Sequence, residues 1–581
     1  MAKVNIKVNG MDIQAEEGVT ILEACKSAGI NIPTLCYLKE LNSIGACRVC
    51  VVEVKGARNL VASCVYPIQN GMEIFTNTPR VLQSRKTTVE LMLSNHNADC
   101  TGCVRSKNCE LQALAQELGC DPQKFQGEKT YPTSEEDVTE YLIRDNSKCI
   151  LCRRCVAACK VNQHVAVIGP NHRGFHTTIG STFDLSLKHV PCVACGQCIT
   201  VCPTGALREK DDIDRVTAAL NDPKKHVIVA TAPAVRVALG EEFGYPIGTN
   251  VQGKMVTALK RIGFQKVFDV DFAADVTIME EGTEFLHRLN EGGVLPMITS
   301  CSPGWINFIE QYYPEFLPNL STTKSPQQIY GALAKTYYAK ANGLDPKDIY
   351  VVSIMPCVAK KTEILRDHQH AAGEGIPDLD AVLTTRELAR LIRRQGLMFR
   401  NLPEGEFDSF MGLASSAGLI FGTTGGVMEA ALRTIKETVE HRPLEQIAFK
   451  QVRGENGIKR ASVTVGGKEV KIAVAHGIEN ANQIMQELKS GKADYQFIEI
   501  MACPGGCVNG GGQPIQPASV RNSIDVRKER AKAMYRADNA SNLRKSHENP
   551  EVIALYRDFL GEPNSHLAHE LLHTSYQNRK K

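Results

Sequence analysis

The sequence has little net charge and no long hydrophobic run. Lysine and arginine total 67 against 64 aspartate and glutamate residues, which leaves a formal net charge of +3. A charge this small argues against nucleic acid or an anionic membrane as the main partner. The best candidate for a membrane span, residues 227–239, contains Pro233 and Arg236 and falls short of the roughly 18 apolar residues required. We therefore expect no membrane span.

A signal peptide is also missing from the sequence pattern. The first eight residues, MAKVNIKV, alternate like a β-strand and lack an apolar signal core, which indicates a cytoplasmic protein. In a reducing compartment, 21 closely spaced cysteines point to metal ligation rather than to disulfides. A chain of 581 residues exceeds what one core supports, so several domains are expected.

Residues 1–79 open with two alternating segments joined at Asn9-Gly10, a pair that favours a type I′ hairpin turn. A helix is expected from Thr20, with Glu23 completing a capping box, and it should end near Gly29. A cysteine loop follows. Hairpin, helix and cysteine loop come in the order found in plant-type 2Fe-2S ferredoxins.

Four cysteines in this first segment fit a 2Fe-2S site, although their spacing differs from the plant-type gaps. A zinc site is the alternative. The four are Cys36, Cys47, Cys50 and Cys64.

The segment from about 80 to 139 looks helical and holds a second ligand group. Its spacing alone fits a zinc knuckle as well as an iron-sulfur site. Its place between two iron-sulfur modules favours a 4Fe-4S cluster with one imidazole ligand. The group is His96, Cys100, Cys103 and Cys109.

Residues 140–209 contain two dense cysteine runs, the second followed by Pro203. Runs with two-residue gaps wrap several corners of a cubane, and in the two-cluster ferredoxin pattern the fourth cysteine of each run serves the other cluster. We therefore expect two 4Fe-4S clusters, one held by Cys149, Cys152, Cys155 and Cys202, the other by Cys192, Cys195, Cys198 and Cys159.

After residue 210, segments rich in valine and isoleucine alternate with helical patterns, which favours α/β architecture. Only four more cysteines occur, in TSCSPGW (299–305), MPCVAKKTE (355–363) and EIMACPGGCVNG (499–510). These segments resemble the signatures TSCCPxW, MPCxxKxxE and ExMxCxxGCxxG of iron-only (FeFe) hydrogenases. The order of the N-terminal modules resembles the iron-sulfur region that these enzymes share with respiratory complex I.

The resemblance implies an H-cluster, a 4Fe-4S cubane joined to a two-iron unit that carries carbon monoxide, cyanide and a dithiolate bridge. By motif position Cys357, Cys503 and Cys507 hold the cubane, and Cys507 also bridges to the two-iron unit. Lys360 falls where the family hydrogen-bonds a cyanide. The expected lining residues of the two-iron pocket are Pro233, Ala234, Gln327, Met355 and Met501, for which ordinary packing is the alternative.

The first signature departs from the family pattern. The family has two adjacent cysteines, of which the first relays protons and the second ligates the cubane, whereas this chain has Cys301 and Ser302. A serine alkoxide is a harder and more basic ligand than a thiolate. Either Ser302 ligates, or Cys301 shifts to ligate and a hydroxyl or water serves the relay. The sequence leaves both interpretations open.

Proton supply to a shielded metal centre requires a chain of titratable or hydroxyl groups. Glu281, Glu284, Arg288 and Ser321 match the family's relay positions. Helical spacing places Glu281, Glu284 and Arg288 along one face, a pattern also typical of a solvated charged face. Together with the resemblance, it favours the relay.

The sequence thus predicts an α/β multidomain hydrogenase. The expected modules are a β-grasp 2Fe-2S ferredoxin domain (1–79), a small helical cluster domain (80–139), a bacterial-type two-cluster ferredoxin domain (140–209), a large α/β H-cluster domain (210–519) and a C-terminal helical region like a small subunit (520–581). Expected partners are ferredoxin or flavodoxin, or NAD(P)-reducing flavoprotein subunits, and the hydrogenase maturation proteins. The rival functions are a non-catalytic electron-transfer subunit, a hydrogen sensor and an iron-sulfur assembly factor.

Overall fold

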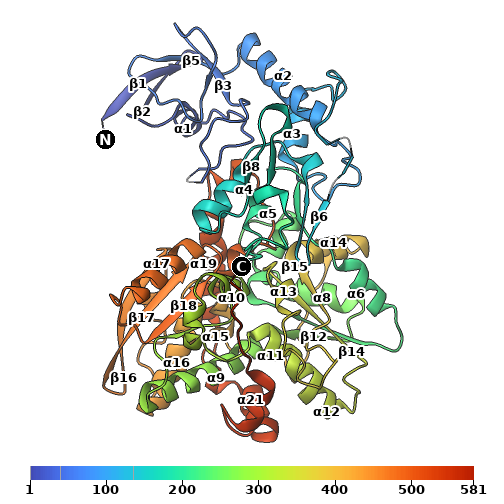
Figure 1. Cartoon of the computed structure of the whole chain (residues 1–581), viewed down its shortest axis with the longest axis vertical. Helices are drawn as coiled ribbons and strands as arrows, with labels where there is room; N and C mark the ends of the chain where they lie inside the picture. Colours follow the sequence, from blue (N-terminus) through green and yellow to red (C-terminus); the bar gives the residue numbers. More distant parts are fainter. Residues whose placement is uncertain (1, 40, 132, 135, 581) are drawn as a thin grey trace.

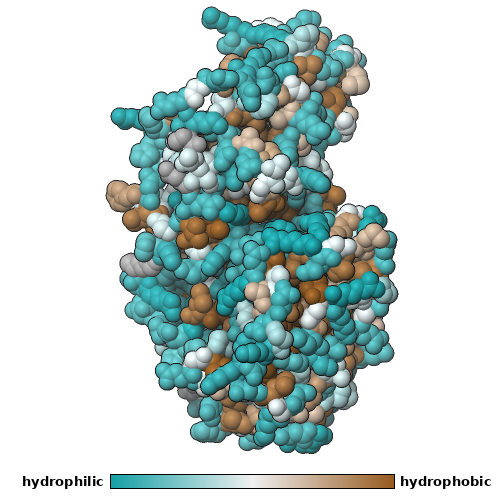
Figure 2. Space-filling view, turned by 90° about the vertical axis from the view of Figure 1, so that its right-hand side faces the viewer, coloured by the Kyte–Doolittle hydropathy of each residue, from teal (hydrophilic) through white to brown (hydrophobic). Residues whose placement is uncertain are grey.

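The computed structural model describes residues 2–39, 41–131, 133–134 and 136–580. The N-terminal modules stack on one end of a larger C-terminal part, in which helices cover two sheets (Figure 1). This arrangement confirms the mixed α/β, multidomain fold class. The face shown in Figure 2 is largely hydrophilic, with hydrophobic side chains in scattered patches. None of the helices in the described ranges is both long and apolar enough to cross a membrane.

The first module is a five-stranded sheet with the strand order β2-β1-β5-β3-β4, packed against helix α1 (Ile21–Ser27). Asn9 and Gly10 both have positive φ, so the predicted hairpin turn is confirmed. The predicted capping box is half formed. The Thr20 hydroxyl accepts from the Glu23 amide, but the Glu23 carboxylate accepts from the Tyr37 hydroxyl instead. The strands are β1 (Lys3–Val8), β2 (Met11–Glu16), β3 (Val51–Val54), β4 (Val61–Ala62) and β5 (Glu73–Phe75).

Two small modules follow. The second is built on α2 (Pro79–Asn95), which begins with Thr78 as N-cap and a proline in its first turn, and on α3 (Glu110–Glu117). The third contains a three-stranded sheet, a two-stranded sheet and two short helices. Its elements are β6 (Glu136–Val138), β7 (Leu142–Asp145), β8 (Gly169–Asn171), β9 (Thr178–Gly180), β10 (Leu207–Glu209), α4 (Arg154–Ala157) and α5 (Gln197–Val201).

The large part holds two four-stranded sheets. In the first, with strand order β12-β11-β14-β15, all the strands are parallel. In the second, with strand order β13-β18-β17-β16, only the β16–β17 pair is antiparallel. The strands are β11 (His226–Thr231), β12 (Lys266–Asp269), β13 (Met297–Ile298), β14 (Ile349–Met355), β15 (Ala381–Thr384), β16 (Ile458–Val465), β17 (Lys468–His476) and β18 (Phe497–Met501).

Helices cover both sheets. Those of the large part are α6 (Ile213–Leu220), α7 (Pro233–Arg236), α8 (Gln252–Ile262), α9 (Val270–Glu291), α10 (Pro303–Tyr312), α11 (Pro326–Leu333), α12 (Ala339–Asn342), α13 (Lys360–Glu363), α14 (Thr385–Arg394), α15 (Ser416–Leu419), α16 (Gly426–Glu440) and α17 (Ile478–Lys489). The tail adds α18 (Ala518–Arg521), α19 (Val526–Ala540), α20 (Pro550–Leu555) and α21 (His566–Leu572).

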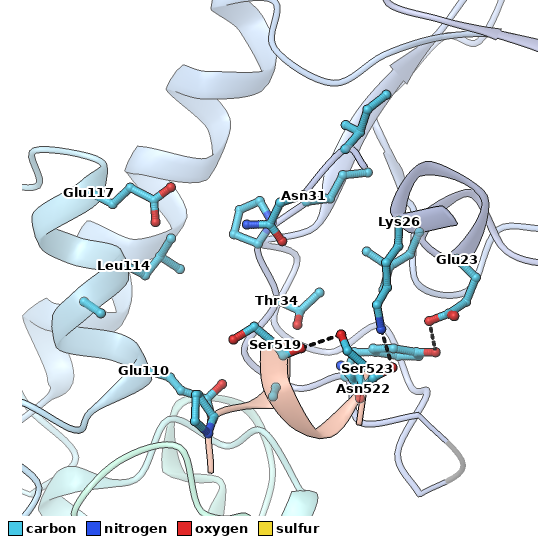
Figure 3. A pocket seen from close by; sticks show the side chains of 18 of the residues that line it. Glu23, Lys26, Asn31, Thr34, Glu110, Leu114, Glu117, Ser519, Asn522 and Ser523 are labelled. Atoms are coloured by element: carbon cyan, nitrogen blue, oxygen red, sulfur yellow. Dashed lines mark hydrogen bonds between the residues drawn. The ribbon is translucent and has the colours of Figure 1, made fainter. Parts of the chain in front are cut away.

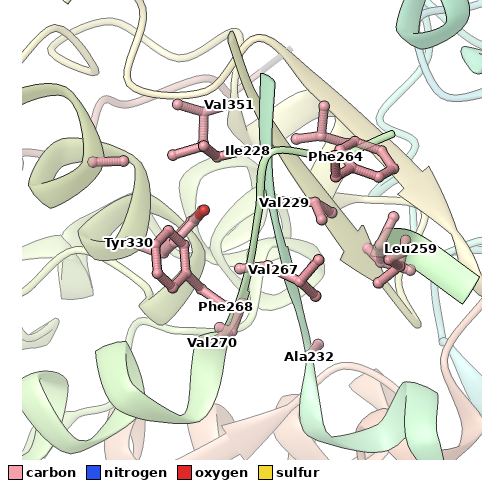
Figure 4. Close-up of a cluster of buried hydrophobic side chains, with 14 of the residues drawn as sticks. Ile228, Val229, Ala232, Leu259, Phe264, Val267, Phe268, Val270, Tyr330 and Val351 are labelled. Carbon is pink, nitrogen blue, oxygen red and sulfur yellow. The ribbon is translucent and has the colours of Figure 1, made fainter. Parts of the chain in front are cut away.

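The core of the first large sheet is apolar on both faces, as a parallel sheet covered by helices requires. Ile228, Val229 and Val267 come from strands β11 and β12, and Leu259 and Tyr330 come from the covering helices (Figure 4). All five are completely buried. This rigid layer fixes the strand ends from which the candidate site is built.

Buried ion pairs join the successive modules. The Arg154 guanidinium donates to both carboxylate oxygens of Glu110 at 2.7 and 3.0 Å and so links the third module to the second. Arg386 donates to Glu209 at 2.6 Å and links the large part to the third module. A crevice remains where α1, α3 and residues 517–523 of the tail meet (Figure 3). The domain boundaries inferred from the sequence stay predictions.

Candidate active site

The first cysteine group is a compact buried cluster. Cys36 contacts Cys47 and Cys64, and Cys64 also contacts Cys50. The hydrogen bond from the neighbouring thiol lowers the pKa of Cys50 to about 6. Four buried thiols in mutual contact form the donor set that a 2Fe-2S core requires. Cys25 lies apart from them in the core of the module, where burial raises its pKa to about 11.

The second group combines a neutral imidazole with three thiols, of which Cys103 neighbours Cys100 and Cys109. His96 is buried, and burial lowers its pKa to about 4. Its Nδ1 atom has no hydrogen-bond partner within the described ranges. A neutral, unpartnered ring nitrogen is suited to bind a metal. Cys103 lies close to Gly205: a β-carbon added to Gly205 would lie 2.6 Å from the Cys103 sulfur. This contact brings the group against the third module.

The third module separates its eight cysteines as the crossed pattern predicts. Cys149, Cys152, Cys155 and Cys202 line one cavity. In the other set, Cys159 neighbours Cys192 and Cys198, and burial raises the pKa of Cys159 to about 11. The fourth cysteine of each run therefore lies with the leading cysteines of the other run.

The four sites form a continuous series. Cys152 of the third module shares one buried cluster with Cys36 and Cys47, and Cys109 packs against this cluster. The Asn42 amide donates to the carbonyls of Cys36 and Cys152 at 2.8 and 3.1 Å. At the other end of the series, Cys195 lines a buried cavity of the C-terminal part. Short separations of this kind suit electron transfer through the chain.

The cavity itself lies where the two large sheets present their carboxyl ends. Ligands bind at this edge of open α/β sheets. Strands β13, β14 and β18 run directly into the three cysteine segments, and β11 runs into Pro233. The predicted residues that line the cavity are Pro233, Cys301, Ser302, Gln327, Met355, Cys357, Lys360, Met501, Cys503 and Cys507.

Two glycines allow the three segments to converge. A β-carbon on Gly304 would lie 2.9 Å from the Ala502 β-carbon, and one on Gly510 would lie 2.1 Å from the Pro356 carbonyl oxygen. Both contacts are too short for any other residue. Ala234 lies outside the cavity lining. It packs with Val508 and Met534, and its carbonyl accepts from Gln513 at 2.9 Å.

Of the three converging cysteines, Cys503 is buried, and Cys357 and Cys507 are partly buried where they line the cavity. Burial raises the pKa values of Cys357 and Cys503, and that of Cys507 to about 12. Thiolates in such a place are stable only when a cation or metal core compensates their charge. The donor set therefore fits an iron-sulfur cubane.

Cys301 and Ser302 face different neighbours. Cys301 lies beside Glu281 and Lys360, and burial raises its thiol pKa well above the ordinary value. The Ser302 hydroxyl accepts from the Ala502 amide at 3.1 Å, next to Cys503. Glu281 thus lies beside Cys301, and Cys503 lies near the next residue, Ser302.

Lys360 is held by a carboxylate that the sequence analysis assigned no role. Its ammonium donates to Glu363 at 2.8 and 3.0 Å and to the Ser325 hydroxyl at 2.8 Å. Glu363 also accepts from Gln327 at 2.9 Å. Glu363 lies inside the second signature, and this position was the only signal that could have identified it.

Three of the predicted relay residues follow one another along α9, and Ser321 lies beside them. Glu281 is completely buried, and burial followed by the nearby Glu284 raises its pKa to about 8. Glu284 accepts from the Ser321 hydroxyl at 2.7 Å and from Arg288 at 2.6 Å. Arg288 is partly exposed, so the line runs from the cavity side toward solvent.

A buried chain of iron-sulfur sites that leads to a thiol-lined cavity defines an electron-transfer oxidoreductase. Residues 225–511 match the model described as iron only hydrogenase large subunit, C-terminal domain, and residues 524–579 match iron hydrogenase small subunit. Residues 1–79 match a 2Fe-2S iron-sulfur cluster binding domain, residues 85–124 match the NADH-ubiquinone oxidoreductase-G iron-sulfur binding region, and residues 148–206 match a 4Fe-4S dicluster domain.

Individual relatives agree with these matches. The chain is 46% identical over 100% of both lengths to the NADP-reducing hydrogenase subunit HndD of Solidesulfovibrio fructosivorans. It is 43% identical to iron hydrogenase 1 of Clostridium pasteurianum, over 98% of this chain and 99% of the relative. A solved apo FeFe-hydrogenase HydA1 variant from Chlamydomonas reinhardtii covers 64% of this chain and 100% of its own at 42% identity, with a TM-score of 0.57. The chain belongs to the iron-only (FeFe) hydrogenase family.

Proposed function

We propose that this iron-only hydrogenase catalyses the reversible reduction of two protons by two electrons to H2, with electrons supplied through four accessory clusters. One observation supports the proposal: Cys195 and Cys301 line the same cavity. Cys195 belongs to the series of predicted cluster ligands, and Cys301 lies beside Glu281. Electrons and protons thus have separate routes to one place. A hydrogenase needs both routes, whereas a passive electron-transfer subunit needs only the first.

The proposed accessory clusters are one 2Fe-2S and three 4Fe-4S clusters, held by the four ligand groups described above. Cys357, Cys503 and Cys507 would hold the cubane of the H-cluster, with Ser302 at its fourth corner. When bound, the two-iron unit supplies the site at which H2 is formed or split. Cys301, which lines the cavity beside Glu281, would hold and pass a proton at its thiol sulfur.

The surrounding residues bind and orient. Lys360 supplies a positive charge at the cavity wall, held in place by Glu363 and Ser325. Pro233, Met355 and Met501 exclude water from the cavity. Glu281, neutral near pH 7, donates or accepts a proton at its buried carboxyl, and Ser321, Glu284 and Arg288 connect it toward solvent.

The motifs that the sequence contains and lacks indicate which electron partner the chain would use. Its sequence has no recognisable flavin or nicotinamide motif, and the relative HndD is named as a subunit of an NADP-reducing hydrogenase. We therefore propose flavoprotein subunits that reduce NAD(P) as electron partners, with ferredoxin or flavodoxin as the alternative. Anaerobic assays with H2 distinguish the two kinds of partner. A ferredoxin-linked enzyme should reduce purified ferredoxin directly. An enzyme linked to flavoprotein subunits should reduce NADP only after the co-expressed subunits are added.

The test of the activity is anaerobic expression with the hydrogenase maturation proteins, followed by H2 evolution from a reduced viologen. We expect turnover that requires maturation. Matured protein that contains iron-bound carbon monoxide and cyanide but never turns over would favour a hydrogen sensor. Protein that carries only the accessory clusters would favour an electron-transfer subunit.

A further inference from the structure

The C-terminal tail pairs with the short segment that carries the relay hydroxyl. His573 and Thr323 form an antiparallel bridge. On either side of it, the Lys324 amide donates to the Leu572 carbonyl and the Thr574 amide donates to the Thr322 carbonyl, each at 2.8 Å. Residues more than 240 positions apart in the chain thus form a strand-like pair next to Glu284.

His573 joins the partly buried Thr322 to the buried Glu280 of α9. Its Nδ1 atom lies 2.7 Å from the Thr322 hydroxyl, and its Nε2 atom lies 3.1 Å from the Glu280 carboxylate. Glu280 is completely buried on α9, where it also accepts from the Tyr556 hydroxyl at 2.5 Å and from the Asn564 amide at 2.8 Å. Because Glu280 is fixed from three sides, it holds the imidazole in one orientation. With Nε2 donating to Glu280, Nδ1 accepts from Thr322.

The segment that His573 holds, residues 321–322, donates hydrogen bonds to the Glu284 carboxylate. The Thr322 amide donates to both oxygens of Glu284 at 3.1 and 3.2 Å, and the Ser321 hydroxyl donates to the same carboxylate at 2.7 Å. The Tyr576 hydroxyl donates to the Ser321 carbonyl at 2.9 Å. The tail therefore fixes two of the residues that orient Glu284, Thr322 through its side chain and Ser321 through its main chain, while Arg288 donates to the same carboxylate from α9.

We propose that His573 and Tyr576 are positioning residues of the proton relay, which they serve by holding Ser321 and Thr322 against Glu284. The inference rests on the proposed hydrogenase function. Proton transfer requires donor and acceptor within hydrogen-bond reach. A displacement of about 1 Å in a reacting geometry costs on the order of a hundredfold in rate. Neither residue lines the cavity; both act through the segment that holds Ser321 and Thr322 against Glu284.

Two substitutions at His573 separate its two contacts. An asparagine amide reaches the place of Nδ1 and retains the contact with Thr322, whereas a glutamine amide reaches the place of Nε2 and retains only the contact with Glu280. We expect His573→Gln to lower H2 evolution by about tenfold or more, with an increased solvent isotope effect and a shifted pH profile. His573→Asn should recover part of this loss. Tyr576→Phe should behave like His573→Gln.

The control is His569→Gln. His569 lies beside His573, with ring centroids 4.1 Å apart and the rings tilted, but it is exposed and lies outside the relay, so this variant should match wild type. Iron content and the infrared bands of the diatomic ligands should be unchanged in all variants. A loss of rate that only follows lost iron, or an unaltered isotope effect and pH profile, would overturn the proposal.

Amide hydrogen exchange provides a readout that does not need turnover. His573→Gln and Tyr576→Phe should accelerate exchange at residues 321–324, while His569→Gln should not. If wild type evolved no H2, the proposed function would fail, and this measurement would still decide whether the tail holds the relay segment. Unchanged exchange would contradict the inference in either case.

Discussion

At the scale of a single residue, Glu281 is the proposed proton carrier. Burial raises the pKa of this carboxyl to about 8, so it is protonated near pH 7 and loses its proton as the pH rises through that value. We expect H2 evolution to decline above about pH 8. Glu281→Gln, which keeps the shape and removes the exchangeable acid, should cost on the order of 10² to 10⁴ in rate.

The measurement is the pH profile of H2 evolution for wild type and Glu281→Gln at equal iron content. Glu479→Gln provides a control at a partly exposed carboxylate far from the relay. If the glutamine variant retained both the rate and the decline above pH 8, Glu281 would not belong to the relay.

Ser302 is the second residue whose role can be tested. Cys301 lies beside Glu281, and the Ser302 hydroxyl lies beside Cys503, so we expect serine at the fourth corner of the cubane. Ser302→Cys should replace a hard oxygen by a soft thiolate and shift the potential and the paramagnetic resonance spectrum of the cubane. Cys301→Ser should leave that spectrum intact and reduce turnover. The opposite pattern would show that Cys301 ligates and Ser302 serves the relay.

At the scale of elements, the two cysteine runs exchange their fourth residues. Cys202 lies with Cys149, Cys152 and Cys155, whereas Cys159 lies with Cys192 and Cys198. Cys159→Ser should therefore perturb the cluster next to the cavity, and Cys202→Ser the cluster next to the 2Fe-2S module. Resonance spectra and redox titration of each variant distinguish the two clusters. If each substitution changed the cluster of its own run, the crossed arrangement would be refuted.

Helix α19 is docked by a buried ion network that is important for stability. Asp538 is completely buried. Its burial raises its pKa, but hydrogen bonds from Arg433 and Arg544 outweigh this effect and hold the pKa below the ordinary value. Asp538→Asn should lower the free energy of unfolding by about 3–5 kcal/mol, because it leaves arginine charges buried without their partner.

The sign of the pH dependence follows from this lowered pKa. The stabilisation from Asp538 is present above the unfolded pKa near 3.8 and is lost as the pH falls toward the folded value. Denaturant titration measures both effects. Glu529→Gln, in an exposed pair with Lys532, should change stability by less than about 0.5 kcal/mol. Equal stabilities of the Asp538 and Glu529 variants would contradict this account.

For the whole molecule, the sequence predicted those features that a short stretch of residues encodes by itself. Cysteine spacing and the three signatures predicted the ligand groups and their order, because clusters require donors at fixed short intervals. The contacts across long chain distances could not be predicted. Glu280 and His573 act through partners that only the folded chain brings together, and no local pattern marks them. The position of Ala234 behind the cavity wall is a further example.

The central claim is that thiolates from three separate segments meet in one cavity to hold a six-iron centre, for a total of about 20 irons per chain. The most direct test is the infrared spectrum of anaerobically matured protein. We expect bands from iron-bound carbon monoxide and cyanide that disappear in Cys507→Ala while the accessory clusters remain. Matured protein with complete accessory clusters and no such bands would contradict the account.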